Sequence, residues 1–96
     1  MNQRIDRKAG HGSFVYMVEC RDGSLYTGWT TDAEQRVRTH NSGHGAKYTR
    51  SRRPVTLVYL EKLEAKEDAL KREAAIKKMK RPQKLELLLS ERNLIR

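Results

Sequence analysis

The distribution of apolar residues along the chain first predicts strands. Residues 13–20, 24–30 and 55–60 are rich in β-branched and aromatic side chains, a composition typical of strands. The turn sequence Arg-Asp-Gly separates the first two runs. We therefore expect the folded part of the chain to begin with a hairpin and to gain a third strand later.

Two later patterns predict helices. Within residues 30–43, Ala33, Arg36, Val37 and His40 fall in one arc of about 100°. A core-facing stripe needs the alanine and the valine, but it does not need the arginine and the histidine. These two residues are therefore candidates for a second role.

The second helical pattern covers residues 65–80, with Glu73 in the middle of its apolar arc. Pro82 fits the first turn of a last helix. That last helix is predicted to bury three leucines, Leu85, Leu88 and Leu89.

The resulting order, β-β-α-β-α-α, is typical of an α+β domain with helices packed on a small three-stranded antiparallel sheet. We expect a single domain over residues 13–96, because no linker or repeat is visible. Residues 1–12 are polar, basic and aperiodic, which predicts a disordered lead-in. Residues 41–54 are expected to form a loop punctuated by glycines.

The length of the first turn decides which side chains share a face of the sheet. A two-residue Asp-Gly turn would pair Glu19 with Tyr26 and place Tyr16 and Tyr26 on opposite faces. A three-residue Arg-Asp-Gly loop with a left-handed glycine would pair Tyr16 with Gly28 instead. The sequence allows both loops, and only the second brings the two phenols onto one face.

The charge of the chain indicates the class of partner. Its 96 residues include 21 Lys and Arg against 12 Asp and Glu, a formal net charge of +9. Such an excess favours a polyanion, with nucleic acid ahead of a membrane surface. No apolar run is long enough to cross a bilayer, no secretory leader is visible and Cys20 is the only cysteine, so we expect a reduced, cytoplasmic protein.

The predicted loop at 41–54 is the strongest electrostatic signal. It carries four cations and no acid: Lys47, Arg50, Arg52 and Arg53. Cations on a flexible, acid-free loop are typical of phosphate contacts with a nucleic acid. Tyr48 in the same loop either stacks on a base or anchors the loop.

Other side chains allow both an ordinary and a chemical interpretation. Glu73 either pairs with Lys77 one turn later or points into a cleft to hold a divalent cation. Arg36 either lays its stem on the core or contacts an anion, and His40 is by itself more typical of a packed or capping residue. Jointly, two phenols, a guanidinium and a carboxylate are the groups that phosphodiester hydrolysis requires.

The spacing of the tyrosines, Gly28 and Arg36 resembles the motifs of a known family. FVYM at 14–17 is followed by YTG at 26–28, and Arg36 stands ten residues after Tyr26. With the longer stretches VYMVECRDGSLYTGWTTDAEQRVRTHNSGHGAKYTRSRRPVTLVY and ALKREAAIKKMKRPQK, the chain resembles the GIY-YIG nuclease superfamily and its small stand-alone UPF0213 branch. The resemblance covers about residues 14–89 and implies the GIY-YIG fold.

The resemblance implies a role for each matching residue. Tyr16 and Tyr26 match the two motif tyrosines, which in the family lie by the attacking water, one of them as its general base directly or through a relay. Arg36 matches the arginine that stabilises the transition state. Glu73 matches the glutamate that holds one Mg²⁺ or Mn²⁺ ion, and His40 stands where relatives carry His or Tyr near the nucleophile.

Gly28 matches the glycine of the second motif and is expected to leave space beside Tyr16 for the phosphate or its water. Two positions depart from the family pattern: Phe14 replaces a glycine and Thr27 an isoleucine. Trp29 replaces a lysine that UvrC-like domains carry after the glycine. The family's late asparagine has no match, and Lys84 is the best substitute for it as a nucleic-acid contact.

The resemblance thus implies a metal-dependent endonuclease that hydrolyses DNA, in repair or recombination. We expect low sequence specificity, because no zinc finger or helix-turn-helix is visible, and branched or single-stranded DNA as candidate substrates. The alternative is a nucleic-acid-binding module without turnover, which the basic loop would serve equally well.

Overall fold

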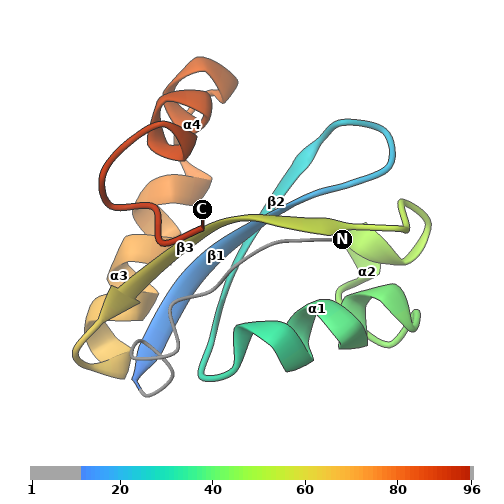
Figure 1. Cartoon of the computed structure of the whole chain (residues 1–96), viewed down its shortest axis with the longest axis horizontal. Coiled ribbons are helices and arrows are strands. Elements are labelled where there is room, and N and C mark those ends of the chain that lie inside the picture. Colours follow the sequence, from blue (N-terminus) through green and yellow to red (C-terminus); the bar gives the residue numbers. More distant parts are fainter. Residues whose placement is uncertain (1–11, 96) are drawn as a thin grey trace.

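The sheet is antiparallel and has the strand order β2-β1-β3 (Figure 1). Strand β1 (Ser13–Glu19) is central, between β2 (Leu25–Thr30) and β3 (Thr56–Leu63). The structure, a computed structural model, describes residues 12–95. The predicted lead-in at 1–12 therefore lies outside the described residues, except for Gly12.

Helices cover both faces of this sheet. Within the described residues they are α1 (Ala33–Asn41), α2 (Lys47–Arg50), α3 (Lys66–Lys77) and α4 (Arg81–Leu88). Figure 1 shows α1 and α2 on one side of the sheet and α3 and α4 on the other. The α+β fold is confirmed, with the order β-β-α-α-β-α-α. The added element is α2, a single turn inside the predicted loop.

The hairpin adopts the three-residue loop. Tyr16 pairs with Gly28 across β1 and β2. Gly23 has a φ of +86°, a left-handed conformation that favours glycine. Both Tyr16 and Tyr26 consequently pack in the cluster that faces α1.

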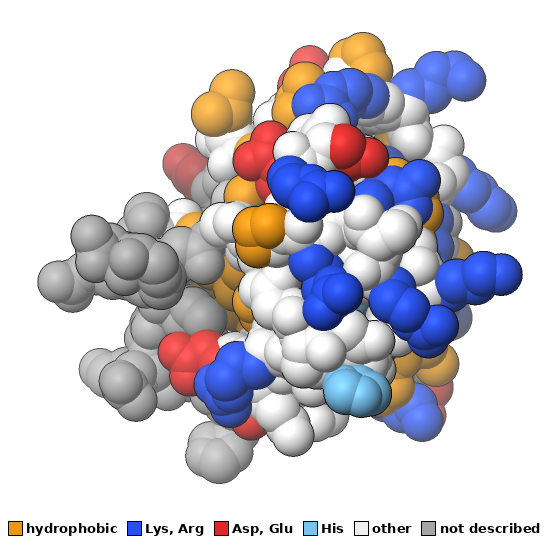
Figure 2. Space-filling view, turned by 90° about the vertical axis from the view of Figure 1, so that its right-hand side faces the viewer, with side chains coloured by type: hydrophobic (Ala, Val, Ile, Leu, Met, Phe, Trp, Pro, Cys, Tyr) orange, Lys and Arg blue, Asp and Glu red, His pale blue; other side chains and the backbone are white. Residues whose placement is uncertain are grey.

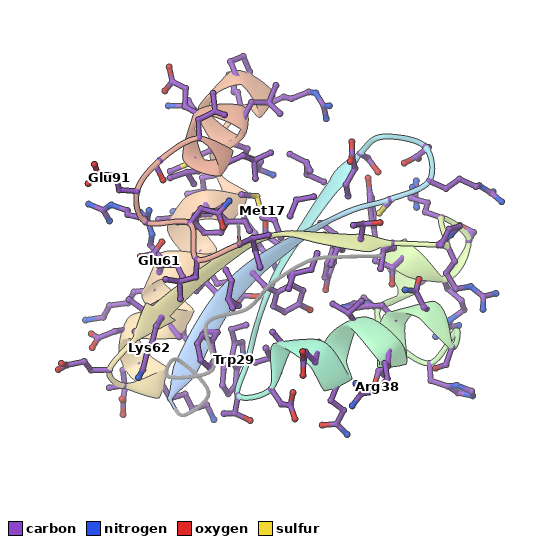
Figure 3. The ribbon with its side chains drawn as sticks, viewed as in Figure 1. Met17, Trp29, Arg38, Glu61, Lys62 and Glu91 are labelled. Atoms are coloured by element: carbon purple, nitrogen blue, oxygen red, sulfur yellow. The ribbon has the colours of Figure 1, made fainter. Side chains whose placement is uncertain are left out.

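Alternation along β1 divides the core into two clusters. Phe14, Tyr16 and Val18 pack on the α1 side of the sheet. Val15 and Met17 pack on the other side, against α3; Figure 3 labels Met17. One face of the central strand can therefore carry chemistry while the other contributes packing.

Strand β3 extends beyond its predicted end at residue 60, because a buried acid continues it. Glu61 is only 8% exposed and accepts hydrogen bonds from Tyr59 Oη at 2.5 Å and Arg72 Nε at 3.0 Å. A paired and hydrogen-bonded carboxylate is tolerated inside a protein. Figure 3 shows Glu61 on the side of α3. A charged residue therefore does not mark the end of this strand.

The prediction that α4 buries Leu85, Leu88 and Leu89 is wrong for Leu85 and Leu89. Leu85 is 39% exposed and Leu89 is 90% exposed, whereas Leu88 and Leu87 are partly buried against the α3-side cluster. The helix ends at Leu88, so Leu89 lies beyond its last turn. Helical spacing predicts which residues share a face but not whether another element covers it. No helix in the described part of the chain is long and apolar enough to cross a membrane.

Candidate active site

The phenol of Tyr16 is the centre of the candidate site. Its side chain is 1% exposed, and its Oη lies 2.8 Å from His40 Nε2 and 3.4 Å from Arg36 Nε. Arg36 and His40 are one turn apart on α1 and therefore share a helix face. The Asp32 side chain caps this helix by accepting a hydrogen bond from the amide of Gln35. The structure thus brings Tyr16 of β1 together with two residues of α1 that lie 20 and 24 positions later in the sequence.

His40 is held on its other side by α2. Its Nδ1 lies 2.8 Å from Thr49 Oγ1, which in turn lies 3.0 Å from the carbonyl oxygen of Ala46. Gly45 permits this close approach, because a Cβ there would collide with the imidazole. Sequence reasoning misses both Thr49 and Gly45. The available signal was the uncharged pair Ala46 and Thr49, three residues apart and each followed by a cation, which suits the inner side of one helical turn.

Gly28 makes room for Tyr16 itself. A Cβ built at Gly28 would lie 2.5 Å from Tyr16 Oη and 2.7 Å from its Cζ. The structure therefore corrects the expectation that a phosphate or its water uses this space, because the phenol fills it. A side chain at Gly28 would push Tyr16 away from His40.

Burial and the nearby guanidinium set the charges at this centre. Burial raises the pKa of Tyr16, and Arg36 offsets only part of that rise. Burial, with a further contribution from the charge of Arg36, lowers the pKa of His40 to about 4. Phenol and imidazole are therefore both neutral at pH 7. No acid within residues 12–95 forms an ion pair with Arg36, so its charge favours an incoming anion.

Tyr26 reaches the same centre through its ring. Its centroid lies 5.4 Å from that of His40, edge to face, and 5.8 Å from that of Tyr48 in a stacked arrangement. The guanidinium carbon of Arg52 lies 3.9 Å from the Tyr48 centroid, and Arg52 Nε pairs with Asp22 at 3.1 Å. Tyr48 therefore anchors α2 in this structure, and the charge of Arg52 is already compensated.

Glu73 approaches from α3, which packs against β1 and β2. Its Oε2 lies 3.2 Å from Lys77 Nζ, and that nitrogen lies 5.9 Å from the Tyr26 centroid. The charge of Glu73 also contributes to the raised pKa of Tyr16, after burial and the other nearby groups. The acid thus lies near the phenols without a hydrogen bond to them, and the ordinary pairing with Lys77 is present.

A hollow of about 410 Å³ beside α2 is lined by Arg21, Asn41, Arg50, Ser51, Arg53 and Pro54. Arg53 is fixed there, because its Nε donates to the Arg50 carbonyl at 2.8 Å. None of the three arginines pairs with an acid in the part of the chain that the structure describes. Figure 2 shows Lys and Arg side chains spread over the side of the molecule that carries the hairpin loop and α2. Sequence reasoning missed Arg21, which the hairpin places beside the loop.

Two predicted nucleic-acid contacts lie at the periphery. Lys47 is exposed at the start of α2. Lys84 lies on α4, which Figure 1 shows apart from α1 and α2. The structure does not bring Lys84 into contact with Tyr16, Arg36 or Glu73.

Similarity to known proteins extends over most of the chain. Residues 12–86 match the family described as the GIY-YIG catalytic domain. The chain belongs to the GIY-YIG family. Two UPF0213 proteins are similar to it: that of Streptococcus pneumoniae is 52% identical over 87 residues, which is 88% of each chain, and that of Staphylococcus aureus is 59% identical over 75 residues, 78% of this chain and 92% of the relative.

A solved structure shows the same relationship. The solution NMR structure of the UPF0213 protein of Bacillus halodurans is 44% identical to this GIY-YIG domain and has a TM-score of 0.55, covering 83% of this chain and 85% of that one. The predicted family, UPF0213 branch and fold are therefore confirmed.

Proposed function

We propose that this GIY-YIG domain is a metal-dependent endonuclease that hydrolyses DNA phosphodiester bonds with low sequence specificity. The main support is one buried arrangement: the phenol of Tyr16 lies between the neutral imidazole of His40 and the guanidinium of Arg36, which forms no ion pair within residues 12–95. This places a proton acceptor beside a site for anionic charge, the two functions that attack by water on a phosphodiester needs.

Tyr16 activates the attacking water in this mechanism. As the water oxygen bonds to phosphorus, the water gives its proton to Tyr16 Oη, and Tyr16 passes its own proton to His40 Nε2. The bond from phosphorus to the 3′ oxygen breaks, and that oxygen takes a proton from solvent. A relay is needed because a free phenol is only about one part in a thousand ionised at pH 7, and burial makes ionisation of Tyr16 harder.

Arg36 stabilises the charge that develops on the non-bridging oxygens. Its guanidinium has no acid to compensate it within residues 12–95, so it is available to the phosphate. Loss of a donor of this kind costs about 10²–10³ in rate. Arg36→Ala is therefore expected to remove cleavage while leaving the fold and most DNA binding.

Glu73 would hold the single Mg²⁺ or Mn²⁺ ion. The described residues contain no cluster of three metal-ligating side chains. Mg²⁺ nevertheless fits one carboxylate, because it keeps several waters and shares phosphate ligands with the substrate. The chemistry that the ion supplies is charge stabilisation at the leaving 3′ oxygen. Affinity without DNA should be weak, since Lys77 already pairs with this carboxylate.

The cleavage test uses plasmid and branched DNA with Mn²⁺ or with a chelator. Arg36→Ala and Glu73→Ala should each abolish cutting, whereas two controls on the same helices should not. Arg38 points away from the sheet on α1 (Figure 3), and Glu67 is exposed on α3, so Arg38→Ala and Glu67→Ala should cut normally.

Cutting at the wild-type rate by either site variant would show that the site is wrong. DNA binding without cleavage by the wild-type domain under all these conditions would support the module without turnover. Preferential cutting of branched DNA would favour a role in repair or recombination.

The hollow beside α2 is the proposed contact for the DNA backbone. Combined replacement of Arg21, Arg50 and Arg53 by Ala should weaken binding to all sequences alike. It should also reduce the slope of log K against log salt by roughly 2 to 3, if each arginine contacts one phosphate. Arg52→Ala is the matched control and should change the slope little, because Asp22 already compensates Arg52.

A further inference from the structure

Thr49 is a buried polar residue on the basic turn that sequence reasoning does not connect with catalysis. Its side chain is 0% exposed, and it contacts His40 Nδ1 at 2.8 Å and the Ala46 carbonyl at 3.0 Å. His40 is also 0% exposed, so neither residue exchanges these contacts for water. The side chain that α2 turns towards the core is therefore hydrogen-bonded to the imidazole of His40.

The hydrogen-bond donors along this chain of contacts determine the His40 tautomer. A carbonyl oxygen only accepts, so the Thr49 hydroxyl donates to Ala46, and its oxygen accepts the proton on His40 Nδ1. His40 Nε2 is then unprotonated and accepts the hydroxyl proton of Tyr16 at 2.8 Å. This assignment gives every one of these protons an acceptor.

The opposite tautomer leaves one buried proton without a partner. With hydrogen on Nε2, the imidazole would donate to Tyr16 Oη, which also faces Arg36 Nε. Without substrate and the attacking water, the phenol proton would then have no acceptor among the described residues, and a buried unsatisfied donor costs about 1–3 kcal/mol. Satisfaction of hydrogen bonds therefore selects the tautomer with hydrogen on Nδ1.

We propose that Thr49 is a positioning residue that holds His40 as the acceptor for the Tyr16 proton. The proposal depends on the proposed nuclease mechanism for its kinetic consequence, but not for the tautomer itself. Gly45 supports it, because only a residue without a Cβ lets α2 come this close to the imidazole.

Substrate strengthens the same relay. After burial, the charge of Arg36 is the second cause of the low pKa of His40. A phosphate beside Arg36 offsets that charge, so the imidazole becomes a better proton acceptor when DNA is bound.

The experiment compares Thr49→Val with Thr49→Ser. Valine keeps the shape and removes the hydrogen-bonding oxygen, whereas serine keeps that oxygen. We expect Thr49→Val to lower kcat about 10–100-fold, the loss typical when a hydrogen bond that orients a metal-binding histidine is removed, with KM for DNA unchanged. Thr49→Ser should remain within a few-fold of wild type. Thermal unfolding of both variants checks that each domain is folded at the assay temperature.

A second readout needs no cleavage. The ¹⁵N chemical shifts of the His40 ring, measured without DNA, distinguish a protonated Nδ1 from a protonated Nε2. Wild type and Thr49→Ser should carry hydrogen on Nδ1, and Thr49→Val should shift the population towards Nε2. Hydrogen on Nε2 in the wild-type domain would overturn the proposal, even if the protein cuts DNA. A Thr49→Val variant that keeps hydrogen on Nδ1 would also overturn it. Hydrogen on Nδ1 that moves towards Nε2 in Thr49→Val, in a domain that cuts no DNA, would support the role of Thr49 and reject the nuclease function.

Discussion

Two buried tyrosines on opposite faces of one small sheet have different partners. Tyr16 is 1% exposed and donates to neutral His40, with Arg36 beside it. Tyr59 is 0% exposed and donates to the carboxylate of Glu61, which Arg72 also binds. Burial raises the pKa of both phenols; the hydrogen bond and charge of Glu61 raise that of Tyr59 further, to about 12.

The partners therefore distinguish a phenol that can relay a proton from one that supports the fold. Around Tyr59 the carboxylate of Glu61 and the guanidinium of Arg72 compensate each other, so this cluster has no free positive charge to attract an anion. Around Tyr16 the guanidinium is uncompensated within residues 12–95, and the acceptor of the phenol proton is neutral at pH 7. Burial and a raised pKa alone do not identify the functional tyrosine; its hydrogen-bond partners do.

The largest expected difference between the two faces is catalytic. Tyr16→Phe removes the group that receives the water proton, and cleavage should fall about 10²–10⁴-fold. Tyr59→Phe removes a hydroxyl of the same kind from the other face, and the cleavage rate should stay near that of wild type. Initial rates on plasmid DNA with Mn²⁺ measure both. Equal losses in the two variants would mean that the comparison between the faces has no catalytic meaning.

The second difference concerns stability, and here the larger loss is expected on the α3 side of the sheet rather than on the α1 side. Arg72→Met leaves Glu61 buried, with Arg92 at 3.9 Å as its one remaining ion-pair partner among the described residues, and should cost about 3 kcal/mol of unfolding free energy. Arg36→Met removes a cation that pairs with no acid in residues 12–95, and should cost less than about 1 kcal/mol. Urea denaturation of both variants at pH 7 measures the contrast. A larger loss for the Arg36 variant would show that the α1 side is held together by that guanidinium.

Acid should weaken the α1 side through His40. The folded-state pKa of about 4 lies below the unfolded value of 6.5, so between these pH values only the unfolded chain binds the proton. Stability is therefore fully present above pH 6.5 and falls as the pH drops towards 4, by a total of about 3 kcal/mol. NMR titration measures the pKa of His40 in the folded protein, and urea denaturation between pH 7 and pH 4 measures how the free energy of unfolding changes. Titration of His40 near 6.5 in the folded protein would contradict the linkage.

Local chemistry accounts for the parts of this molecule that the sequence predicts well. The Arg-Asp-Gly turn limits the hairpin to two registers, and the structure has the one with a left-handed Gly23, which pairs Tyr16 with Gly28. Helical spacing places Arg36 and His40 on one face of α1, and the tyrosine spacing leads to the family. These features depend on neighbours within one or two elements, which a linear pattern contains.

Contacts between distant segments explain the parts that were missed. The length of β3 depends on the pairing of Glu61 with Arg72, and the exposure of Leu89 depends on where α4 stops. Thr49 becomes a partner of His40 only because α2 is a helical turn that packs on α1. The role of Gly28 depends on the path of the Tyr16 ring across the sheet. No periodicity along the chain contains such information.

A small gain in stability, rather than a loss, is expected at Thr27, where the family pattern has an isoleucine. Thr27 is 3% exposed, shares the α3 side of β2 with Leu25 and Trp29, and its hydroxyl has no hydrogen-bond partner among the described residues. Thr27→Val keeps the shape and removes this unsatisfied group. The variant should be more stable by about 1 kcal/mol, because burying a hydroxyl without a partner is unfavourable.

Thr49→Val is the matched control for this prediction, since it makes the same chemical change on the other face. There the hydroxyl makes two hydrogen bonds, so the change should destabilise the domain by about 1–3 kcal/mol. Thermal unfolding separates the two outcomes, because 1 kcal/mol corresponds to roughly 4–8 °C in a domain of this size. A destabilised Thr27→Val variant would mean that its hydroxyl has a partner, such as a buried water between β2 and α3. The α3 side of β2 would then also contain a hydrogen-bonded buried hydroxyl, and the two sides of the sheet would differ less in how their buried polar groups are satisfied.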